Sequence, residues 1–342
     1  MSKARALRAD FVPNEEEREA LLGSGLVRIP LDTPFPVDPV NVTLVLGDPP
    51  ALIDTGLRHG ENRHSLEEAL AEHGLRIRDL GEIYMTHPHL DHFGLAGELA
   101  QESGARVFAW SESVSRYEDY VRFADLDRKA FGSLLSQAGA SETLMGLHQE
   151  RTSHFNDTAG PVEITDPFVV GEPLWIAGRH RVLPLHVPGH SPWCVAYWFE
   201  EAQILVTGDA LLPRITSNPL WYPQEAAPSS WQGLEAYTAS LEKMSELPIQ
   251  WAIPGHGASF QEVTQSAQRA IYHLTRRQKR VMSILEDGQL SLFELAEAMF
   301  GEHLARQATF LVMSEAVRHV DWLRALGRLQ EHPGSLLRYS LL

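Results

Sequence analysis

The chain has 342 residues, of which 44% are hydrophobic, 22% charged and 8% aromatic, and its formal net charge is −16. This composition excludes disordered, collagen-like and coiled-coil proteins and is typical of a globular protein. A single cysteine, Cys194, excludes a disulfide framework and any cysteine-rich metal site within the chain.

The first residues give no sign of a targeting segment. Residues 1–17 contain no apolar run after their basic residues, so we expect no signal peptide. No stretch of the chain reaches the roughly 18 apolar residues that a membrane span requires. We therefore expect a cytoplasmic protein that does not enter a membrane.

The first part of the chain alternates β-rich and helical segments. Short β-rich runs separated by Pro, Asp and Gly predict strands, and apolar residues at helical spacing before a glycine predict helices. The predicted strands are 26–31, 40–46, 51–54, 82–86 and 106–110, and the predicted helices are 61–73 and 93–103. Such an alternation indicates an α/β layered fold.

The middle of the chain contains an insertion and then more strands. Residues 111–160 are mixed and only weakly helical, so we interpret them as a helical insertion that lies over the preceding loops. Its predicted helices are 114–124, 129–135 and 142–148, and the strands predicted after it are 182–186, 194–199, 204–207 and 250–253.

The C-terminal part differs in charge. Residues 266–342 contain 10 Lys and Arg residues and 8 Asp and Glu residues, whereas the rest of the chain is strongly acidic. The pattern predicts three helices and a final strand, at 264–285, 292–300, 308–326 and 336–341. We therefore divide the chain into a domain of residues 1–262 and a winged-helix-like domain of residues 263–342.

A dense group of metal-ligand side chains lies where a strand gives way to a helix. The segment Thr86–His92 reads THPHLDH and contains His87, His89, Asp91 and His92. Imidazole and carboxylate groups are the ligands that zinc takes in proteins, and side chains that spread from one loop can converge on an ion. The alternative is chance clustering in a chain with 16 histidines.

Three further ligand-type residues follow predicted strands. They are His190 in VPGHSP, Asp209 in TGD and His256 in PGHG. Any one of them alone would be read as a turn or capping residue. Together with the first group they lie in loops at the same edge of the predicted sheets, which favours a shared metal site.

These motifs, with Asp54 in IDTG, resemble the metallo-β-lactamase-fold hydrolase superfamily over roughly residues 20–260. The resemblance implies an α/β fold of the αββα four-layer type with two metal ions. It implies a first ion on His87, His89 and His190, a second ion on Asp91, His92 and His256, and Asp209 as the bridge between them.

The resemblance also implies the chemistry. Two divalent ions about 3.5–4 Å apart make a hydroxide nucleophile available near neutral pH, and this would attack an acyl carbonyl. Asp91 and Asp209 are then the catalytic carboxylates, and Asp91 would relay a proton to the leaving group. Asp54 would orient a loop or a ligand histidine. The ligand set suits zinc best, although related sites take iron or manganese.

Residues around the site have less specific signals. Arg214, Trp221 and Tyr222 follow Asp209 and either line a substrate pocket or pack between the sheet and the insertion. We read Cys194 as a small buried residue in an apolar strand rather than as a reactive thiol.

The function that the resemblance favours is metal-dependent hydrolysis of a small-molecule thioester, ester or lactone. Within the superfamily, the chain is most similar to the branch of hydroxyacylglutathione hydrolases, thioesterases and lactonases. The alternatives are a lactamase-like or phosphodiester hydrolase of the same fold, and a winged-helix DNA-binding regulator. The acidic charge of the chain disfavours nucleic acid as a partner, and the predicted helix 308–326 carries only Arg318 and Arg324 as basic residues. We expect the C-terminal domain to form a homodimer or to cover the active site.

Overall fold

Two sheets form the centre of the computed structural model, which describes residues 13–35, 37, 39–152, 158–223, 226–228, 231 and 233–342. The first sheet has the order β1-β2-β3-β4-β5-β6, with β1 (Leu26–Leu31), β2 (Val40–Val45), β3 (Ala51–Ile53), β4 (Glu82–Tyr84), β5 (Arg106–Trp110) and β6 (Asp166–Phe168). The second has the order β11-β10-β9-β8-β7, with β7 (Leu174–Ile176), β8 (His180–His186), β9 (Val195–Phe199), β10 (Ile204–Gly208) and β11 (Trp251–Pro254).

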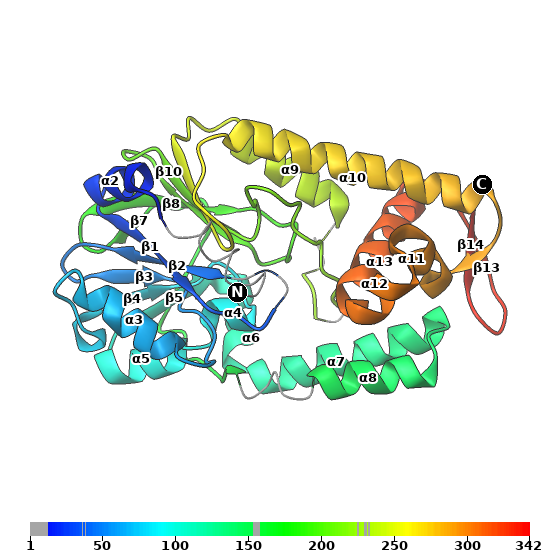
Figure 1. Cartoon of the computed structure of the whole chain (residues 1–342), viewed down its shortest axis with the longest axis horizontal. Helices are drawn as coiled ribbons and strands as arrows, with labels where there is room; N and C mark the ends of the chain where they lie inside the picture. Colours follow the sequence, from blue (N-terminus) through cyan, green and yellow to red (C-terminus); the bar gives the residue numbers. More distant parts are fainter. Residues whose placement is uncertain are drawn as a thin grey trace, which may run out of the picture.

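Helices cover the outer faces of both sheets (Figure 1). The helices of this part of the chain are α2 (Glu15–Gly23), α3 (Asn62–Ala71), α4 (Leu90–Phe93), α5 (Ala96–Ser103), α6 (Val114–Glu118), α7 (Tyr120–Ala138), α8 (Glu142–Thr152) and α9 (Leu234–Ser245), with short 3-10 turns at Ile77–Asp79 and Ser111–Ser113. Leu66 and Leu99 bury α3 and α5 against the first sheet, and Leu241 buries α9 against the second. These layers confirm the predicted αββα fold.

The space between the sheets is filled by large side chains from both. Tyr84 of the first sheet and Tyr197 of the second are buried there with their ring centroids 6.0 Å apart. Strand β2 reads VNVTLV, and all six of its residues are buried, as expected for a strand covered on both faces. The β-branched side chains of such runs fit the pleated surface, which is why the sequence identified these strands.

The C-terminal part is a second, smaller group of helices with its own sheet. It consists of α10 (Val263–Glu286), β12 (Leu290–Ser291), α11 (Leu292–Phe300), α12 (Glu302–Gln307), α13 (Thr309–Ala325), β13 (Leu329–His332) and β14 (Arg338–Leu341), with the sheet order β12-β14-β13. The predicted helices and final strand are present, and the structure adds β12, α12 and β13. The likeness to a winged helix and the division at residue 263 stay predictions.

Helix α10 joins the two parts of the molecule along its upper edge in Figure 1. Its first half packs with α9, through Ala267 and Leu274, and its second half belongs to the C-terminal core through Val281 and Leu285. One helix therefore takes part in both cores.

The insertion helices have other bounds than expected and contact the C-terminal helices. The predicted helix 114–124 is divided between α6 and the start of α7, and α7 continues through the predicted helix 129–135 to Ala138. Phe131 and Leu135 of α7 are buried in the same apolar cluster as Val312 and Leu323 of α13. The insertion therefore rests on the C-terminal helices, and this packing lets α7 continue through Gly132 despite the low helix propensity of glycine. Residues 153–157 of the predicted insertion lie outside the described residues.

The sequence did not identify α2, α9 or the short strands β6 and β7. Strands of three residues are too short to show a period of two, and their pairing with neighbouring strands defines them instead.

Two other expectations concern Cys194 and membrane-spanning helices. Cys194 is buried, as predicted. Among the described residues, no helix has both the length and the apolar character needed to cross a membrane.

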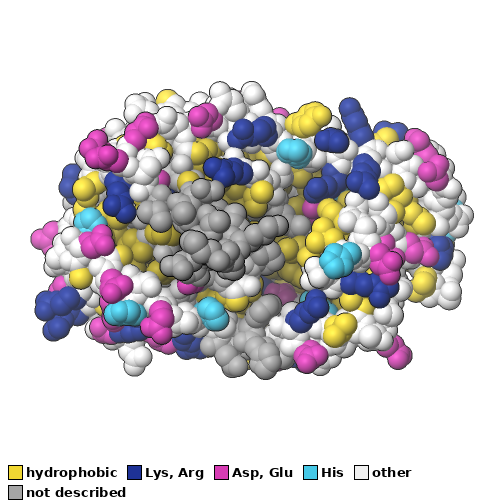
Figure 2. Space-filling view, viewed as in Figure 1, with side chains coloured by type: hydrophobic (Ala, Val, Ile, Leu, Met, Phe, Trp, Pro, Cys, Tyr) yellow, Lys and Arg dark blue, Asp and Glu magenta, His cyan; other side chains and the backbone are white. Residues whose placement is uncertain are grey.

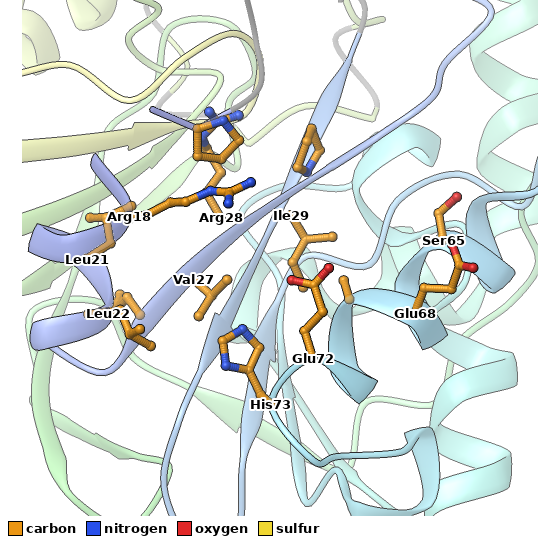
Figure 3. Close-up of a pocket in the computed structure, with 14 residues that line it drawn as sticks. Arg18, Leu21, Leu22, Val27, Arg28, Ile29, Ser65, Glu68, Glu72 and His73 are labelled. Carbon is orange, nitrogen blue, oxygen red and sulfur yellow. The ribbon is translucent and has the colours of Figure 1, made fainter. Parts of the chain in front are cut away.

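A cavity of about 430 Å³ lies between α2, β1 and α3 (Figure 3). Figure 3 shows Arg28 on β1 and Glu68 on α3 among its lining residues. Arg28 is buried and its Nε donates to Glu17 Oε1 at 2.6 Å, while its Nη1 donates to Asn41 Oδ1 at 3.0 Å. None of the candidate metal ligands lines this cavity.

The buried ion pair of Arg28 and Glu17 gives a test of stability. We expect Arg28→Met to lower the free energy of unfolding by about 3–5 kcal/mol, because it leaves the Glu17 carboxylate buried without its cation. The measurement is chemical denaturation. The control is Arg63→Met, whose ion pair with Glu102 is exposed and should contribute less than about 1 kcal/mol. Equal effects of the two substitutions would contradict this account.

Candidate metal centre

The candidate ligands lie in four segments, each of which follows a strand, and in the first of them Asp91 and His92 belong to the short helix α4. Strand β4 ends at Tyr84 and leads into Thr86–His92, and β8 ends at His186 before His190. Asp209 directly follows β10, and His256 comes two residues after the end of β11. The sheets therefore bring to one edge the side chains that the sequence predicted to meet there.

Three imidazoles form the first group of donors. His87, His89 and His190 place one nitrogen each within 4.8 Å of one another. His89 Nδ1 lies 2.8 Å from His87 Nε2 and 2.9 Å from His190 Nε2. This is the set that the resemblance assigned to the first ion.

The second group combines a carboxylate with two imidazoles. Asp91, His92 and His256 also offer donor atoms within 4.8 Å of one another. His256 Nε2 lies 3.4 Å from Asp91 Oδ2, and His92 Nε2 lies 4.0 Å from Asp91 Oδ1. This is the set assigned to the second ion.

Asp209 lies between the two groups. Its Oδ2 is 3.4 Å from His190 Nε2 of the first group and 3.5 Å from His256 Nε2 of the second. Its Oδ1 faces His92 Nε2 at 3.5 Å, and both of these buried atoms lack a hydrogen-bond partner among the described residues. A metal cation would satisfy both atoms, so the residues present fit the predicted ions.

Asp54 hydrogen-bonds the start of the histidine-rich segment and the ring of His92. Its Oδ1 accepts from the backbone N–H of Thr86 at 2.9 Å, and its Oδ2 accepts from the Thr86 hydroxyl at 2.7 Å. Oδ2 also lies 2.8 Å from His92 Nδ1, which must donate because a carboxylate accepts. Thus His92 presents its other nitrogen, Nε2, to the centre, as the predicted orienting role of Asp54 requires.

Backbone carbonyls orient two other histidines. His190 Nδ1 donates to Asn218 O at 2.7 Å, and His256 Nδ1 donates to Pro39 O at 3.0 Å. Since a carbonyl can only accept, Nδ1 of each ring carries the donated proton, and each ring directs Nε2 to the centre. Sequence reasoning did not identify Asn218 or Pro39, because a carbonyl carries no side-chain signal.

The loops approach one another so closely that one position requires glycine. A Cβ on Gly255 would lie 2.1 Å from Asp209 Oδ1 and 2.8 Å from His92 Cε1. Asp54 itself has a φ of 60°, which is uncommon outside glycine. Such backbone conformations occur at sites where the surrounding structure fixes a functional side chain.

Burial and charge decide the protonation of the centre. Burial lowers the pKa of His87 and His89 well below the ordinary histidine value. Burial also acts to lower the pKa of His256, but the charges of Asp209 and Asp91 outweigh it and raise this pKa to about 10. Burial acts to raise the pKa of Asp91, but the positive charges of His92 and His256 outweigh it and lower this pKa to about 2. A proton on His256 therefore compensates the carboxylates in the metal-free protein, and a bound cation would take over that role.

Tyr222 connects the centre to a smaller cavity. Its hydroxyl hydrogen-bonds His89 Nε2, and its ring packs edge-on against Trp193 at a centroid distance of 5.0 Å. Trp193 and Arg116 line a cavity of about 360 Å³, and the Arg116 guanidinium lies 4.7 Å from the centroid of Trp193 and 5.4 Å from that of Tyr222. Arg116 is buried and forms an ion pair with Asp127.

The other two pocket candidates lie elsewhere. Arg214 is exposed. Trp221 packs at the edge of the C-terminal core, where its ring centroid lies 6.2 Å from that of Phe131. Of the three predicted pocket residues, only Tyr222 contacts a candidate ligand among the described residues. Sequence reasoning missed Arg116, whose insertion helix gave no motif.

Known sequences resemble this chain over most of its length. A family model described as the metallo-beta-lactamase superfamily matches residues 35–256, which include all the candidate ligands. A probable metallo-hydrolase, YqjP, of Bacillus subtilis is 27% identical over 301 residues, or 87% of this chain and 91% of the relative. An atrochrysone carboxyl ACP thioesterase of Aspergillus fumigatus is 23% identical over 262 residues, or 73% of this chain and 64% of the relative.

Solved structures extend the likeness to the C-terminal helices. The metallo-beta-lactamase family protein TTHA1429 of Thermus thermophilus superposes with a TM-score of 0.77 at 29% identity and covers 93% of this chain and 99% of its own. A beta-lactamase domain protein of Burkholderia ambifaria has a TM-score of 0.80 at 21% identity, with 93% and 92% coverage, and shows the shared fold alone.

The charges of the centre predict how metal-dependent stability varies with pH. The raised pKa of His256 stabilises the metal-free protein fully below its unfolded value of 6.5, and this stabilisation is lost as the pH rises towards about 10. The lowered pKa of Asp91 contributes above 3.8 and is lost as the pH falls towards about 2. We therefore expect the Tm of chelator-treated protein to fall by several degrees from pH 6.5 to about 9.5, and the gain in Tm on adding Zn²⁺ to widen.

Thermal melts with and without Zn²⁺ across this range test the prediction. His256→Gln should flatten the pH dependence, and His273→Gln, at an exposed position on α10, should not. A metal-induced gain in Tm that is constant with pH would contradict the assignment.

Proposed function

Because the chain belongs to the metallo-beta-lactamase superfamily, we propose that it is a hydrolase that uses two divalent metal ions to cleave a thioester, an ester or a lactone. One observation carries the proposal. Two buried groups of donor atoms lie on either side of Asp209, and its two oxygens face histidines of both groups.

When bound, two divalent ions would lower the pKa of water to give a nucleophile near neutral pH, and they would polarise the substrate carbonyl. The first would be held by His87, His89 and His190, and the second by Asp91, His92 and His256. Asp209 would contact both. Zinc is the best match to this imidazole-rich donor set, with iron or manganese as alternatives.

The side chain of Asp91 has a second role in this proposal. Hydrolysis adds water to the acyl carbon and breaks the bond to sulfur or oxygen, so the leaving group needs a proton. The side chain of Asp91 is 12% exposed, whereas that of Asp209 is 7% exposed. Asp91 is therefore the carboxylate that substrate can reach more easily. It would accept the proton of water and pass it to the leaving group.

Two observations support an acyl substrate. Relatives of this chain are named as thioesterases, among them the atrochrysone carboxyl ACP thioesterase. The cavity beside Tyr222 has an apolar side formed by Phe123, Trp193, Ala226 and Ala227, which suits the apolar part of an acyl compound. Its other lining residues are Glu112, Ser115, Arg116 and Pro228. We propose that this cavity takes the acyl group of a small-molecule substrate.

A DNA-binding regulator is less well supported. Residues 312–320, in the helix that would enter a DNA groove, are all buried. The exposed basic residues Arg276, Lys279 and Arg280 lie instead on α10. Figure 2 shows basic side chains along the upper edge of the molecule, where Figure 1 places this helix. The chain as a whole is acidic, with a net charge of −16. A homodimer stays a prediction of the sequence.

Metal analysis joined to a substrate panel tests the proposal. We expect about two metal ions per chain. Hydrolysis of one class among thioesters, lactones and β-lactams should depend on those ions. Asp209→Ala should lower both metal content and turnover, because it removes the carboxylate that contacts both groups. A folded protein that takes up no metal and hydrolyses nothing after reconstitution would reject the proposal.

The role of Asp91 predicts a separate effect. Asp91→Asn keeps an oxygen that can face the ion but cannot carry a proton, so we expect kcat to fall by about 10²–10⁴-fold. Elemental analysis of the same sample must show that the metal content is close to that of the wild type. An unchanged kcat at full metal content would assign the proton transfer to another group.

A further inference from the structure

We propose that the C-terminal helix α13 positions the metal ligand His190, through Asn218 and Leu220, so that this helix supports one of the two metal ions selectively. The inference rests on the proposed function, because it requires that the site bind metal. It gives the C-terminal helices a defined role in the site.

His190 depends on a segment without regular structure. Its Nδ1 donates to Asn218 O at 2.7 Å, and its own backbone oxygen accepts from the backbone N–H of Leu220 at 3.0 Å. Both partners lie in a stretch that is neither helix nor strand. The ring of His190 can therefore be only as well ordered as residues 218–220.

Helix α13 fixes that segment at both of these residues. Asn218 Nδ2 donates to Leu311 O at 3.0 Å and to Glu315 Oε2 at 3.4 Å. Arg318 Nε donates to Leu220 O at 3.3 Å. Residues 311, 315 and 318 are spaced by four and three, so they lie on one face of the helix.

The face of α13 that makes these contacts contains buried charge. Glu315 is 4% exposed and Arg318 is 6% exposed. Arg277 of α10 forms an ion pair with Glu315, and Arg318 lies over the ring of Trp231 at 5.4 Å. Burying charged groups costs free energy that an apolar face would not. Their directional hydrogen bonds fix the 218–220 segment in a way that apolar packing could not.

The supports of the second ion come from the sheets. His92 is held by Asp54, directly after β3, and His256 is held by Pro39, directly before β2. Asn41 of β2 also donates from Nδ2 to Pro254 O and Gly257 O, both at 2.8 Å, on either side of His256. Hence α13 should affect the ion on His87, His89 and His190 and leave the ion on Asp91, His92 and His256 unchanged.

The test is a metal titration of the full chain. Chelator-treated wild type, Asn218→Ala and Arg318→Met are titrated with Zn²⁺ against a chromophoric chelator, and with Co²⁺ to record the absorption bands of each site. We expect two ions in each protein. In both variants the Kd of one ion should rise by about 10–100-fold, and the Kd of the other should stay at its wild-type value.

Two controls make the result specific. Arg324→Met removes the other arginine of α13, which pairs with Glu331 and shares Asp321 with Arg318. It should leave both Kd values unchanged, because the hydrogen bonds of Arg318 and Asn218 to the 218–220 segment and to α13 stay in place. Asn41→Ala should weaken the ion on His256 instead, with a different change in the Co²⁺ spectrum. Circular dichroism and thermal melts establish that each variant is folded.

The outcomes separate this inference from the proposed function. Wild type that binds no metal would reject the proposed function. If wild type binds two ions and each variant binds both ions at wild-type affinity, the role of α13 is overturned. The same follows if each variant binds both ions more weakly to the same extent. In either case the proposed function stands. Because Asn218 is only partly buried, its variant still decides the question if Arg318→Met does not fold. Failure of both to fold would also overturn the inference, since it would assign these residues to global stability.

Discussion

Two carboxylates, Asp91 and Asp209, are buried among five imidazoles at one edge of the sheets, and the structure around them compensates their charge. A buried carboxylate is costly unless hydrogen bonds or cations compensate it. Protonation of His256 supplies some of that compensation in the metal-free protein, and its pKa is raised accordingly. Two buried atoms that face each other, His92 Nε2 and Asp209 Oδ1, still lack hydrogen-bond partners among the described residues, and a divalent cation would satisfy both.

The donor atoms converge in this way because a hydrogen bond at Nδ1 orients the histidine ring on the side away from the centre. Asp54 holds His92, Pro39 holds His256, and Asn218 holds His190. Each of these contacts fixes which nitrogen faces the centre, and that choice decides whether the ring can bind metal. The supports come from different parts of the molecule, so the two groups of donors need not respond together when one part changes. The C-terminal helices supply no candidate ligand in the described part of the chain, yet they contact the segment that holds His190.

The chemistry of the centre and the choice of substrate depend on different residues. The candidate ligands lie in segments that directly follow strands of the two sheets. The walls of the neighbouring cavity come from the insertion and from the segments after β8 and β10, through Arg116, Trp193 and Ala226. The cavity combines apolar residues such as Trp193 and Ala226 with polar ones such as Arg116 and Ser115, so shape, apolar area and polar contacts would all contribute to the choice of substrate.

The sequence by itself determined which residues are candidate ligands and where most of the strands lie. Local signals suffice for these features. β-branched runs bounded by turn residues identify strands such as β2, and the close spacing of His87, His89, Asp91 and His92 indicates a metal site. The order of the later motifs, each after a strand, also placed His190, Asp209 and His256 at one edge.

Only the tertiary structure decided which residues far apart in the sequence contact one another. The carbonyls of Pro39 and Asn218 have no side-chain signature, so nothing in the sequence marks them as supports for His256 and His190. The packing of α7 on the C-terminal helices and the short strands β6 and β7 likewise depend on partners distant in sequence. A contact between residues far apart in the chain is fixed by burial and hydrogen-bond satisfaction in the folded state, and local propensity does not encode it.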